Sequence, residues 1–146
     1  MKIYFDTCGL NRPLDDKTQP RIALEAEAVL AVLSFCNFGA SSLVSSEILE
    51  IETSRNRNSQ RRTYIFETLA MAEERILVTD EIRNRAKELE KCGLKTFDAL
   101  HLACAEAGEV DYFCTCDDRF LRKAKSLEQL KLKIVSPLEL AEEILI

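Results

Sequence analysis

Residues 2–6, Lys2-Ile-Tyr-Phe-Asp6, begin the chain with side chains typical of a β-strand and end on an acid. Cys8-Gly9 and Asn11-Arg12-Pro13 follow, and these residues favour turns and interrupt the strand. Pro20 then opens a segment, residues 20–36, whose apolar residues recur at spacings of three and four, as in an amphipathic helix. A strand, a break and a long helix predict the first unit of an α/β fold.

The same alternation continues to the end of the chain. Further strands are expected at residues 43–45, 75–79, 111–116 and 133–135. Further helices are expected at residues 47–54, 60–74, 80–92, 96–108 and 118–125, and from Pro137 onward, with N-caps at Ser45 or Ser46, Asp80, Thr96 and Asp118. We therefore predict an α/β fold, a three-layer α/β/α sandwich with a mainly parallel central sheet, formed as a single domain over residues 1–146.

Composition limits the classes of protein to consider. Of the 146 residues, 47% are hydrophobic and 31% are charged, which is ordinary for a globular protein. The formal net charge of −5 excludes a global basic field, so contact with nucleic acid must be local. The longest apolar run, residues 28–33, is far shorter than the about 20 residues of a membrane-spanning helix, and no signal peptide is evident. We expect a cytoplasmic protein without membrane contact, whose cysteines are free thiols: Cys8, Cys36, Cys92, Cys104, Cys114 and Cys116.

Three aspartates occupy informative positions. In parallel sheets, ligands bind beyond the carboxyl ends of the strands, and Asp6 and Asp117 follow two predicted strands. Asp98 stands in a helix whose other residues are mostly apolar, so we expect it to be largely buried and to need a partner. The alternatives to a ligand-binding role are structural: a turn at Asp6, a turn at Asp117 and a helix cap at Asp98.

The fourth acid comes from residues 47–52, which contain three glutamates. At about 100° per residue, Glu52 falls within the arc of the helix's apolar residues, whereas Glu47 and Glu50 fall outside it. Glu52 is therefore the preferred inward-facing acid, and Glu47 stays as the alternative.

Clustered carboxylates repel one another unless a cation lies between them. Ligand sets made only of oxygen atoms suit Mg²⁺ or Mn²⁺ better than zinc or copper. A divalent cation at such a site typically supports phosphoryl hydrolysis, because it lowers the pKa of a bound water and stabilises the leaving oxygen.

Four motifs in order resemble the PIN domain family: residues 3–13, Ser46 followed six residues later by Glu52, residues 96–103 and residues 113–120. The resemblance implies a Rossmann-like α/β/α sandwich and a Mg²⁺- or Mn²⁺-dependent ribonuclease. It assigns metal binding and catalysis to Asp6, Glu52, Asp98 and Asp117. By the same analogy, Thr115 supports the acids through its hydroxyl group, and Asn11 adds a polar contact.

Many members of the family are VapC-type toxins of toxin–antitoxin pairs and are often dimeric. The resemblance therefore implies an RNA substrate, a cognate antitoxin as a partner, and a homodimer. No single residue in this chain carries the toxin role by itself.

RNA also requires local positive charge. Residues 54–62 contain four arginines and no acid, and one more arginine lies in the loop after Asp6. The candidate RNA-binding residues are Arg12, Arg55, Arg57, Arg61 and Arg62. A solvated loop and helix start are the alternative for this window. His101 is the only histidine, and we expect it to pack between helices and to hydrogen-bond locally rather than to act as a base.

Three other functions compete with the nuclease. A non-catalytic RNA-binding or adaptor protein would keep the fold without turnover. A receiver domain usually needs an acidic pair around the end of its first strand, where this chain has Asp6 alone. A haloacid dehalogenase-type phosphatase needs Asp-x-Asp after that strand, where this chain has Asp6-Thr7-Cys8. The last two are therefore disfavoured.

Overall fold

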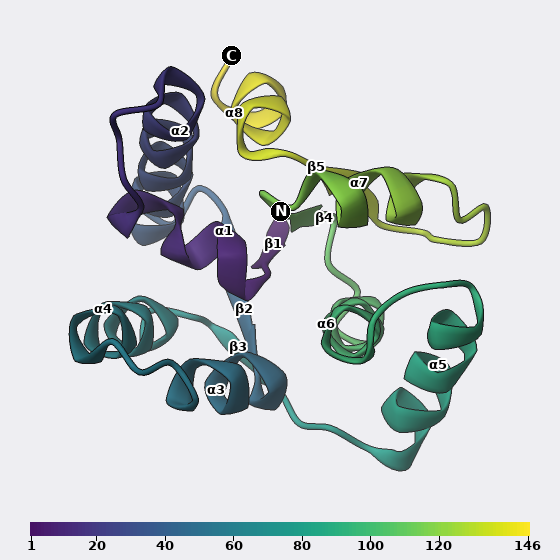
Figure 1. The fold of residues 1–146 in the computed structure, drawn as a ribbon. Helices are drawn as coiled ribbons and strands as arrows, with labels where there is room; N and C mark the ends of the chain where they lie inside the picture. Colours follow the sequence, from purple (N-terminus) through teal and green to yellow (C-terminus); the bar gives the residue numbers. More distant parts are fainter.

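A computed structural model describes all 146 residues and contains one five-stranded sheet with the order β3-β2-β1-β4-β5 (Figure 1). The strands are β1 (Lys2–Phe5), β2 (Ser42–Ser46), β3 (Glu74–Ile76), β4 (Tyr112–Cys114) and β5 (Lys133–Val135). Every neighbouring pair of strands is parallel. The predicted α/β fold is confirmed, and its sheet is parallel throughout.

Helices cover both faces of the sheet, as a three-layer sandwich requires. The long helices are α2 (Pro20–Asn37), α3 (Glu47–Ser54), α4 (Ser59–Leu69), α5 (Asp80–Lys91), α6 (Thr96–Ala107), α7 (Asp118–Lys125) and α8 (Pro137–Leu145). Figure 1 shows α2, α4 and α8 on one side of the sheet and α5, α6 and α7 on the other. Right-handed crossovers explain this division, because the chain moves across the sheet in opposite directions before and after β3.

Several predicted segments differ from the structure, and the strands expected at residues 75–79 and 111–116 are shorter, Glu74–Ile76 and Tyr112–Cys114. The expected break after the first strand contains a short helix, α1 (Thr7–Asn11), and a 3₁₀ turn, η1 (Arg12–Leu14). The helix forms because the Asp6 side chain accepts a hydrogen bond from the Gly9 amide and caps it. The helix predicted over 60–74 ends at Leu69, since the backbone beyond it pairs with β2, beginning with the hydrogen bond from Glu73 N to Leu43 O at 3.1 Å.

The predicted N-caps of α5 and α6 are also one residue too late. Thr79, not Asp80, caps α5, because its side chain accepts a hydrogen bond from the Ile82 amide. Lys95 occupies the N-cap position of α6, so Thr96 is the first residue inside that helix. In both cases the predicted cap has already taken up helical backbone geometry, and the preceding residue is extended.

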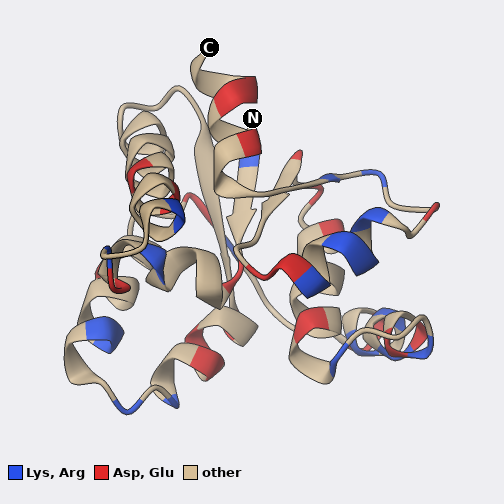
Figure 2. Ribbon diagram, turned by 45° about the horizontal axis from the view of Figure 1, so that its top comes forward, with Lys and Arg blue, Asp and Glu red and all other residues tan.

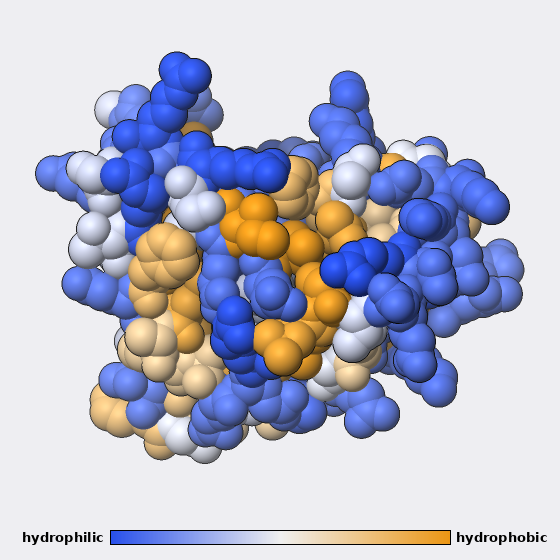
Figure 3. Space-filling model, turned by 90° about the horizontal axis from the view of Figure 1, so that it is seen from below, coloured by the Kyte–Doolittle hydropathy of each residue, from blue (hydrophilic) through white to orange (hydrophobic).

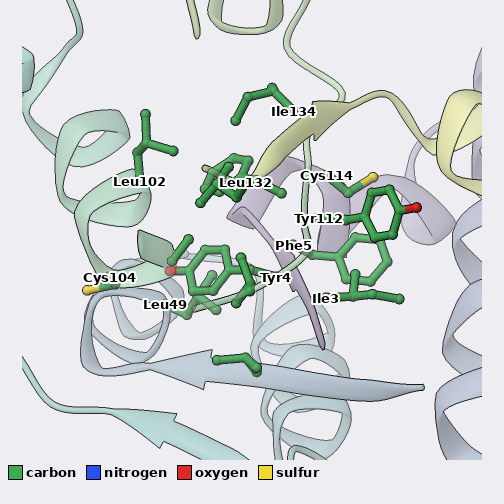
Figure 4. Close-up of a cluster of buried hydrophobic side chains, with 14 of the residues drawn as sticks. Ile3, Tyr4, Phe5, Leu49, Leu102, Cys104, Tyr112, Cys114, Leu132 and Ile134 are labelled. Carbon is green, nitrogen blue, oxygen red and sulfur yellow. The ribbon is translucent and has the colours of Figure 1, made fainter. Parts of the chain in front are cut away.

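The core contains a cluster of 32 buried residues that lies on both faces of the sheet. Tyr4 of β1 stacks on Phe113 of β4, with ring centroids 5.3 Å apart. Figure 4 shows Tyr4 beside Leu49, with its hydroxyl group directed toward α6. All six cysteines are free, as expected. None of the helices combines the length and apolar character needed to cross a membrane.

Apolar side chains also reach the surface near the edge strand β3. Figure 3 shows them in the middle of the face that lies below in Figure 1, where α3 and the β3–α5 connection are found. Leu77, just after β3, is 54% exposed, and Ile51 of α3 is 41% exposed. The edge of the sheet opposite β5 is therefore flanked by exposed aliphatic residues.

Candidate active site

The four predicted acids lie around the carboxyl ends of the central strands. The chain leaves β1 toward β2, and β4 lies on the other side of β1, so the strand order reverses at this point. Asp6 follows β1, Asp117 follows β4, and Asp98 lies in the first turn of α6. Figure 2 shows acidic segments of α3, α6 and the β4–α7 connection around the middle of the ribbon. This is the edge where open α/β sheets bind ligands.

Asp6 is the most buried of these acids, at 5% exposure. Its Oδ1 accepts hydrogen bonds from the Gly9 amide at 3.0 Å and from the Cys8 thiol at 3.2 Å. Burial raises the pKa of Asp6, while hydrogen bonds from Thr115 and Gly9 oppose that rise. The Asp6 amide also donates to Cys114 O at 3.2 Å, which fixes the end of β1 against β4. The carboxylate is therefore held rigidly at the floor of the site.

Asp98 differs from its prediction in one respect. It is half-buried rather than largely buried, because it stands in the first turn of α6 at the edge of the core. No hydrogen bond or ion pair joins its carboxylate to another protein group. Burial, followed by the charges of Asp6 and Asp117, raises the pKa of Asp98 to about 6. A carboxylate that lacks a partner and is repelled by its neighbours is well suited to bind a cation.

Asp117 is exposed and has a second role. Its Oδ1 accepts a hydrogen bond from the Phe120 amide at 3.1 Å and caps α7, which corrects the prediction that Asp118 is the cap. Asp117 has extended backbone geometry and Asp118 begins the helix, where it pairs with Arg21 instead. The buried Thr115 hydroxyl accepts a hydrogen bond from the Asp117 amide at 3.1 Å. The Thr115 hydroxyl group therefore supports Asp117 by contacting its backbone amide, not its carboxylate.

Glu52 faces inward, as the helical wheel predicts. Its Oε1 lies 2.7 Å from His101 Nε2 and also accepts a hydrogen bond from the Thr7 hydroxyl group. Burial alone would raise the pKa of Glu52, but the hydrogen bonds from His101 and Thr7 lower it below its usual value. Both contacts use Oε1, so Oε2 stays available to a ligand.

The competing glutamates are engaged elsewhere. Glu47 Oε1 accepts a hydrogen bond from the Val78 amide at 2.7 Å, and Glu50 pairs with Arg75 at 2.7 Å. Glu47 therefore secures the connection after β3, and Glu50 forms an exposed ion pair. The charge of Glu52, and not that of Glu47, is among those that raise the pKa of Asp98, which favours Glu52 as the fourth acid.

His101 is buried at 2% exposure, and its hydrogen bonds are long-range rather than local. Its Nδ1 lies 2.7 Å from the Tyr4 hydroxyl group, which lies 2.7 Å from Ser46 Oγ. Ser46 Oγ in turn accepts a hydrogen bond from the Leu49 amide at 3.1 Å and caps α3. One arrangement of protons satisfies every group: Ser46 donates to Tyr4, Tyr4 donates to Nδ1, and Nε2–H donates to Glu52. This chain links α3 to α6 through β1.

The sequence analysis did not predict that Tyr4 and Thr7 take part in these hydrogen bonds. Tyr4 looks like an ordinary strand residue, and Thr7 falls in a segment expected to be a break. One signal was present, since a tyrosine with a polar hydroxyl group occurs in an otherwise apolar strand and needs a partner when buried. The partner itself, His101, lies 97 residues away in sequence.

The donor chemistry fits a hard divalent cation. The only ligand atoms on offer are carboxylate oxygens, from Asp6, Glu52, Asp98 and Asp117. The charges of the other three acids all raise the pKa of Asp98. No group of three acidic, histidine or cysteine side chains is already close enough to hold an ion without movement. The residues present fit Mg²⁺ or Mn²⁺ by type.

Two predicted RNA-binding arginines have acidic partners. Arg12 pairs with Asp15 at 2.9 Å and with the buried Glu25 at 3.3 Å. Arg61 pairs with Asp15 at 2.8 Å and donates to Asn11 Oδ1 at 3.2 Å. These contacts join α4 to η1, so much of the charge of both arginines is offset within the protein.

Asn11 and the other three arginines form no ion pair with an acid. Asn11 donates to the Thr7 carbonyl oxygen at 2.9 Å, which fixes it on α1. Arg62 donates to the Asn56 carbonyl oxygen at 2.5 Å. Arg55 and Arg57 are exposed and pair with no acid, and the guanidinium group of Arg55 lies 5.4 Å from the centre of the Phe97 ring. These two are the free cations of the predicted arginine window.

Comparisons with known proteins agree with this architecture. A sequence model described as PIN domain matches residues 3–126. A structure of VapBC2 from Rickettsia felis, bound to a DNA fragment from its promoter, is similar at a TM-score of 0.60 and 14% identity, covering 93% of this chain and 98% of that one. PAE2754 from Pyrobaculum aerophilum is similar at a TM-score of 0.55 and 13% identity, covering 99% and 98%. At these identities the two structures show the fold alone, and no curated protein sequence matches the chain.

Proposed function

The chain belongs to the PIN domain family, and from that premise we propose that it is a metal-dependent ribonuclease that hydrolyses RNA phosphodiester bonds with Mg²⁺ or Mn²⁺. One observation carries the proposal. The half-buried Asp98 carboxylate has no protein partner, and its pKa is raised to about 6 by burial and by the charges of Asp6 and Asp117. Such a carboxylate is costly to keep ionised unless a cation binds it.

The metal would be held by Asp6, Asp98, Asp117 and Glu52. When bound, a divalent cation activates water for attack and offsets the charge that develops on the phosphate. The protein's own groups keep the ligands in place. The Gly9 amide and the Cys8 thiol hold Asp6, and His101 fixes one oxygen of Glu52 while leaving the other free.

The proposal includes two partners. The fold likeness to VapBC2 supports a protein antitoxin as a partner, and with it a toxin role. Many PIN domains are dimers, so we also propose a homodimer. Light scattering of the purified chain measures the dimer directly, and a monomer at micromolar concentration contradicts that part of the proposal alone.

The test combines metal binding with cleavage. We would titrate Mn²⁺ into the wild type, Asp98→Asn and the matched control Asp80→Asn, which changes an exposed acid in the first turn of another helix. The same preparations are then incubated with mixed RNA and Mn²⁺. We expect Mn²⁺ binding and cleavage in the wild type and the control, and the loss of both in Asp98→Asn.

The non-catalytic RNA-binding or adaptor protein stays the second candidate, and the same experiment separates it from the nuclease. A folded wild type that binds RNA but neither binds Mn²⁺ nor cleaves would support that candidate. Cleavage that persists in both Asp98→Asn and Asp6→Asn would refute the proposed site.

A further inference from the structure

A hollow lies beside the acidic site on the side away from the arginine window. It is lined by the turn between α5 and α6 and by the first residues of α7. Asp98 and Asp117 are part of its lining. Three cationic side chains complete its polar lining: Lys95, Arg119 and Lys123. We call these three residues with their enclosed space the basic hollow.

The three cations of the basic hollow are exposed, and none of them forms an ion pair with an acid. This contrasts with Arg12 and Arg61, whose charges are offset by carboxylates. The hollow therefore has three positive and two negative side chains, and its balance is positive even before a divalent cation is bound. A cation on Asp98 and Asp117 would make it more positive still.

A glycine permits the arrangement. Gly93 has a φ of 102°, a conformation that side chains with a Cβ rarely adopt. A Cβ at this position would lie 2.5 Å from Lys123 Cε and 2.6 Å from Lys123 Nζ. The ammonium group therefore rests directly over the turn, in space that another residue at this position would fill. Lys123 is exposed, and its side chain lies over this turn, where it lines the basic hollow.

We propose that the basic hollow binds a phosphate group of the RNA backbone next to the acidic site, with Lys95, Arg119 and Lys123 as its ligands. The proposal rests on the proposed ribonuclease function for the identity of the nucleic acid. A phosphate is the group that joins these features, because it accepts hydrogen bonds from lysine and arginine and also carries the charge that a metal on neighbouring carboxylates attracts. The substrate strand then runs from the acids over the first turn of α7, rather than over residues 54–62.

The test measures binding without turnover. A labelled single-stranded RNA of about 12 nucleotides is titrated with protein in EDTA, and its anisotropy is followed at several salt concentrations. The test variant is Arg119→Gln with Lys123→Gln, which removes two charges and keeps most of the side-chain volume. Two paired variants serve as controls. Arg55→Gln with Arg57→Gln tests the competing path, and Lys87→Gln with Lys131→Gln removes two other exposed, unpaired lysines.

We expect the Arg119→Gln/Lys123→Gln variant to bind RNA roughly three- to thirtyfold more weakly, as loss of two exposed charge contacts implies. Its salt dependence should become shallower by about 0.7 per lost phosphate contact. Both control pairs should bind RNA within about twofold of the wild type, because each loses two positive charges but no contact with the bound phosphate. Urea unfolding checks that all variants are folded, and the single variant Arg119→Gln replaces the pair if that pair is unstable.

Each outcome decides a separate question. Unchanged binding in the test variant, or a larger loss in the Arg55/Arg57 variant, overturns the basic hollow while cleavage by the wild type still supports the ribonuclease. Loss of binding in the test variant with no cleavage by the wild type supports the basic hollow and refutes the nuclease. A wild type that does not bind RNA at low salt overturns the basic hollow outright.

Discussion

Tyr4→Phe is the most direct test of the hydrogen-bond chain between β1, α3 and α6. The substitution removes one oxygen atom and leaves the ring, which is fully buried and stacked on Phe113. No cavity larger than a hydroxyl group results, so the effect on stability comes from hydrogen bonding rather than from packing. The lost contacts are those to His101 Nδ1 and Ser46 Oγ, both at 2.7 Å.

The expected magnitude follows from the partners that remain. Without the Tyr4 hydroxyl group, His101 Nδ1 loses its donor and Ser46 loses its acceptor, and both residues are buried at 2% exposure or less. A buried polar group without a partner costs about 1–3 kcal/mol. We expect Tyr4→Phe to lower the free energy of unfolding by roughly 2–3 kcal/mol, since Ser46 can turn its hydroxyl group toward another acceptor.

Urea denaturation followed by circular dichroism measures this change, and an unchanged slope confirms that the unfolding transition is the same. The control is Tyr64→Phe, which removes a hydroxyl group from a half-buried tyrosine that water can reach, and should cost at most about 0.5 kcal/mol. If Tyr4→Phe costs no more than the control, the chain of hydrogen bonds does not form as described. A double-mutant cycle with His101→Leu should show a coupling of about 1 kcal/mol or more.

The other predictions concern the acids. Because the pKa of Asp98, about 6, lies above its ordinary value of 3.8, its contribution to stability is present below pH 4 and lost as the pH rises through 6. In the absence of metal, Asp98→Asn should therefore stabilise the protein at pH 7 by roughly 1 kcal/mol, a value reduced because the side chain is partly exposed. At pH 4 the substitution should have little effect, and thermal unfolding at both pH values measures the difference. Asp117→Asn should keep the cap of α7 and lose cleavage, whereas Asp117→Ala should lose cleavage and also about 1 kcal/mol of stability. Equal cleavage by Asp117→Asn and the wild type would argue against a role of Asp117 in metal binding. Glu52→Gln should weaken Mn²⁺ binding in calorimetry, while Glu47→Gln should leave it unchanged, and the reverse result would restore Glu47 as the fourth acid.

Much of the architecture could be predicted from local pattern. The alternation of strand-forming and helical segments predicts the parallel α/β sandwich, and helices such as α3 and α7 begin and end where the sequence indicates. Errors concentrate at helix starts, where two polar residues compete. Thr79 precedes Asp80, and Asp117 precedes Asp118, and either member of each pair has a side chain able to cap. Only the backbone path into the helix decides between them.

The candidate site divides in the same way. The positions of Asp6 and Asp117 follow from strand ends, and the inward direction of Glu52 follows from the helical period, so these were accessible from the sequence. The partial exposure of Asp98 was not, because it depends on how far the first turn of α6 projects beyond the core. An apolar helix predicts burial along its length but not at its end.

The sequence by itself determined the order of strands and helices, the oxygen-only chemistry of the acids and their place near one edge of a parallel sheet. These follow from periodicity and residue type, which act over a few neighbouring residues. Tertiary structure alone decided that Tyr4 contacts His101, that Asp15 offsets Arg12 and Arg61, and that Lys123 lies over Gly93. Most of these contacts join residues that are far apart in the sequence, and their energies depend on which charges and hydrogen-bonding groups the folded chain brings together.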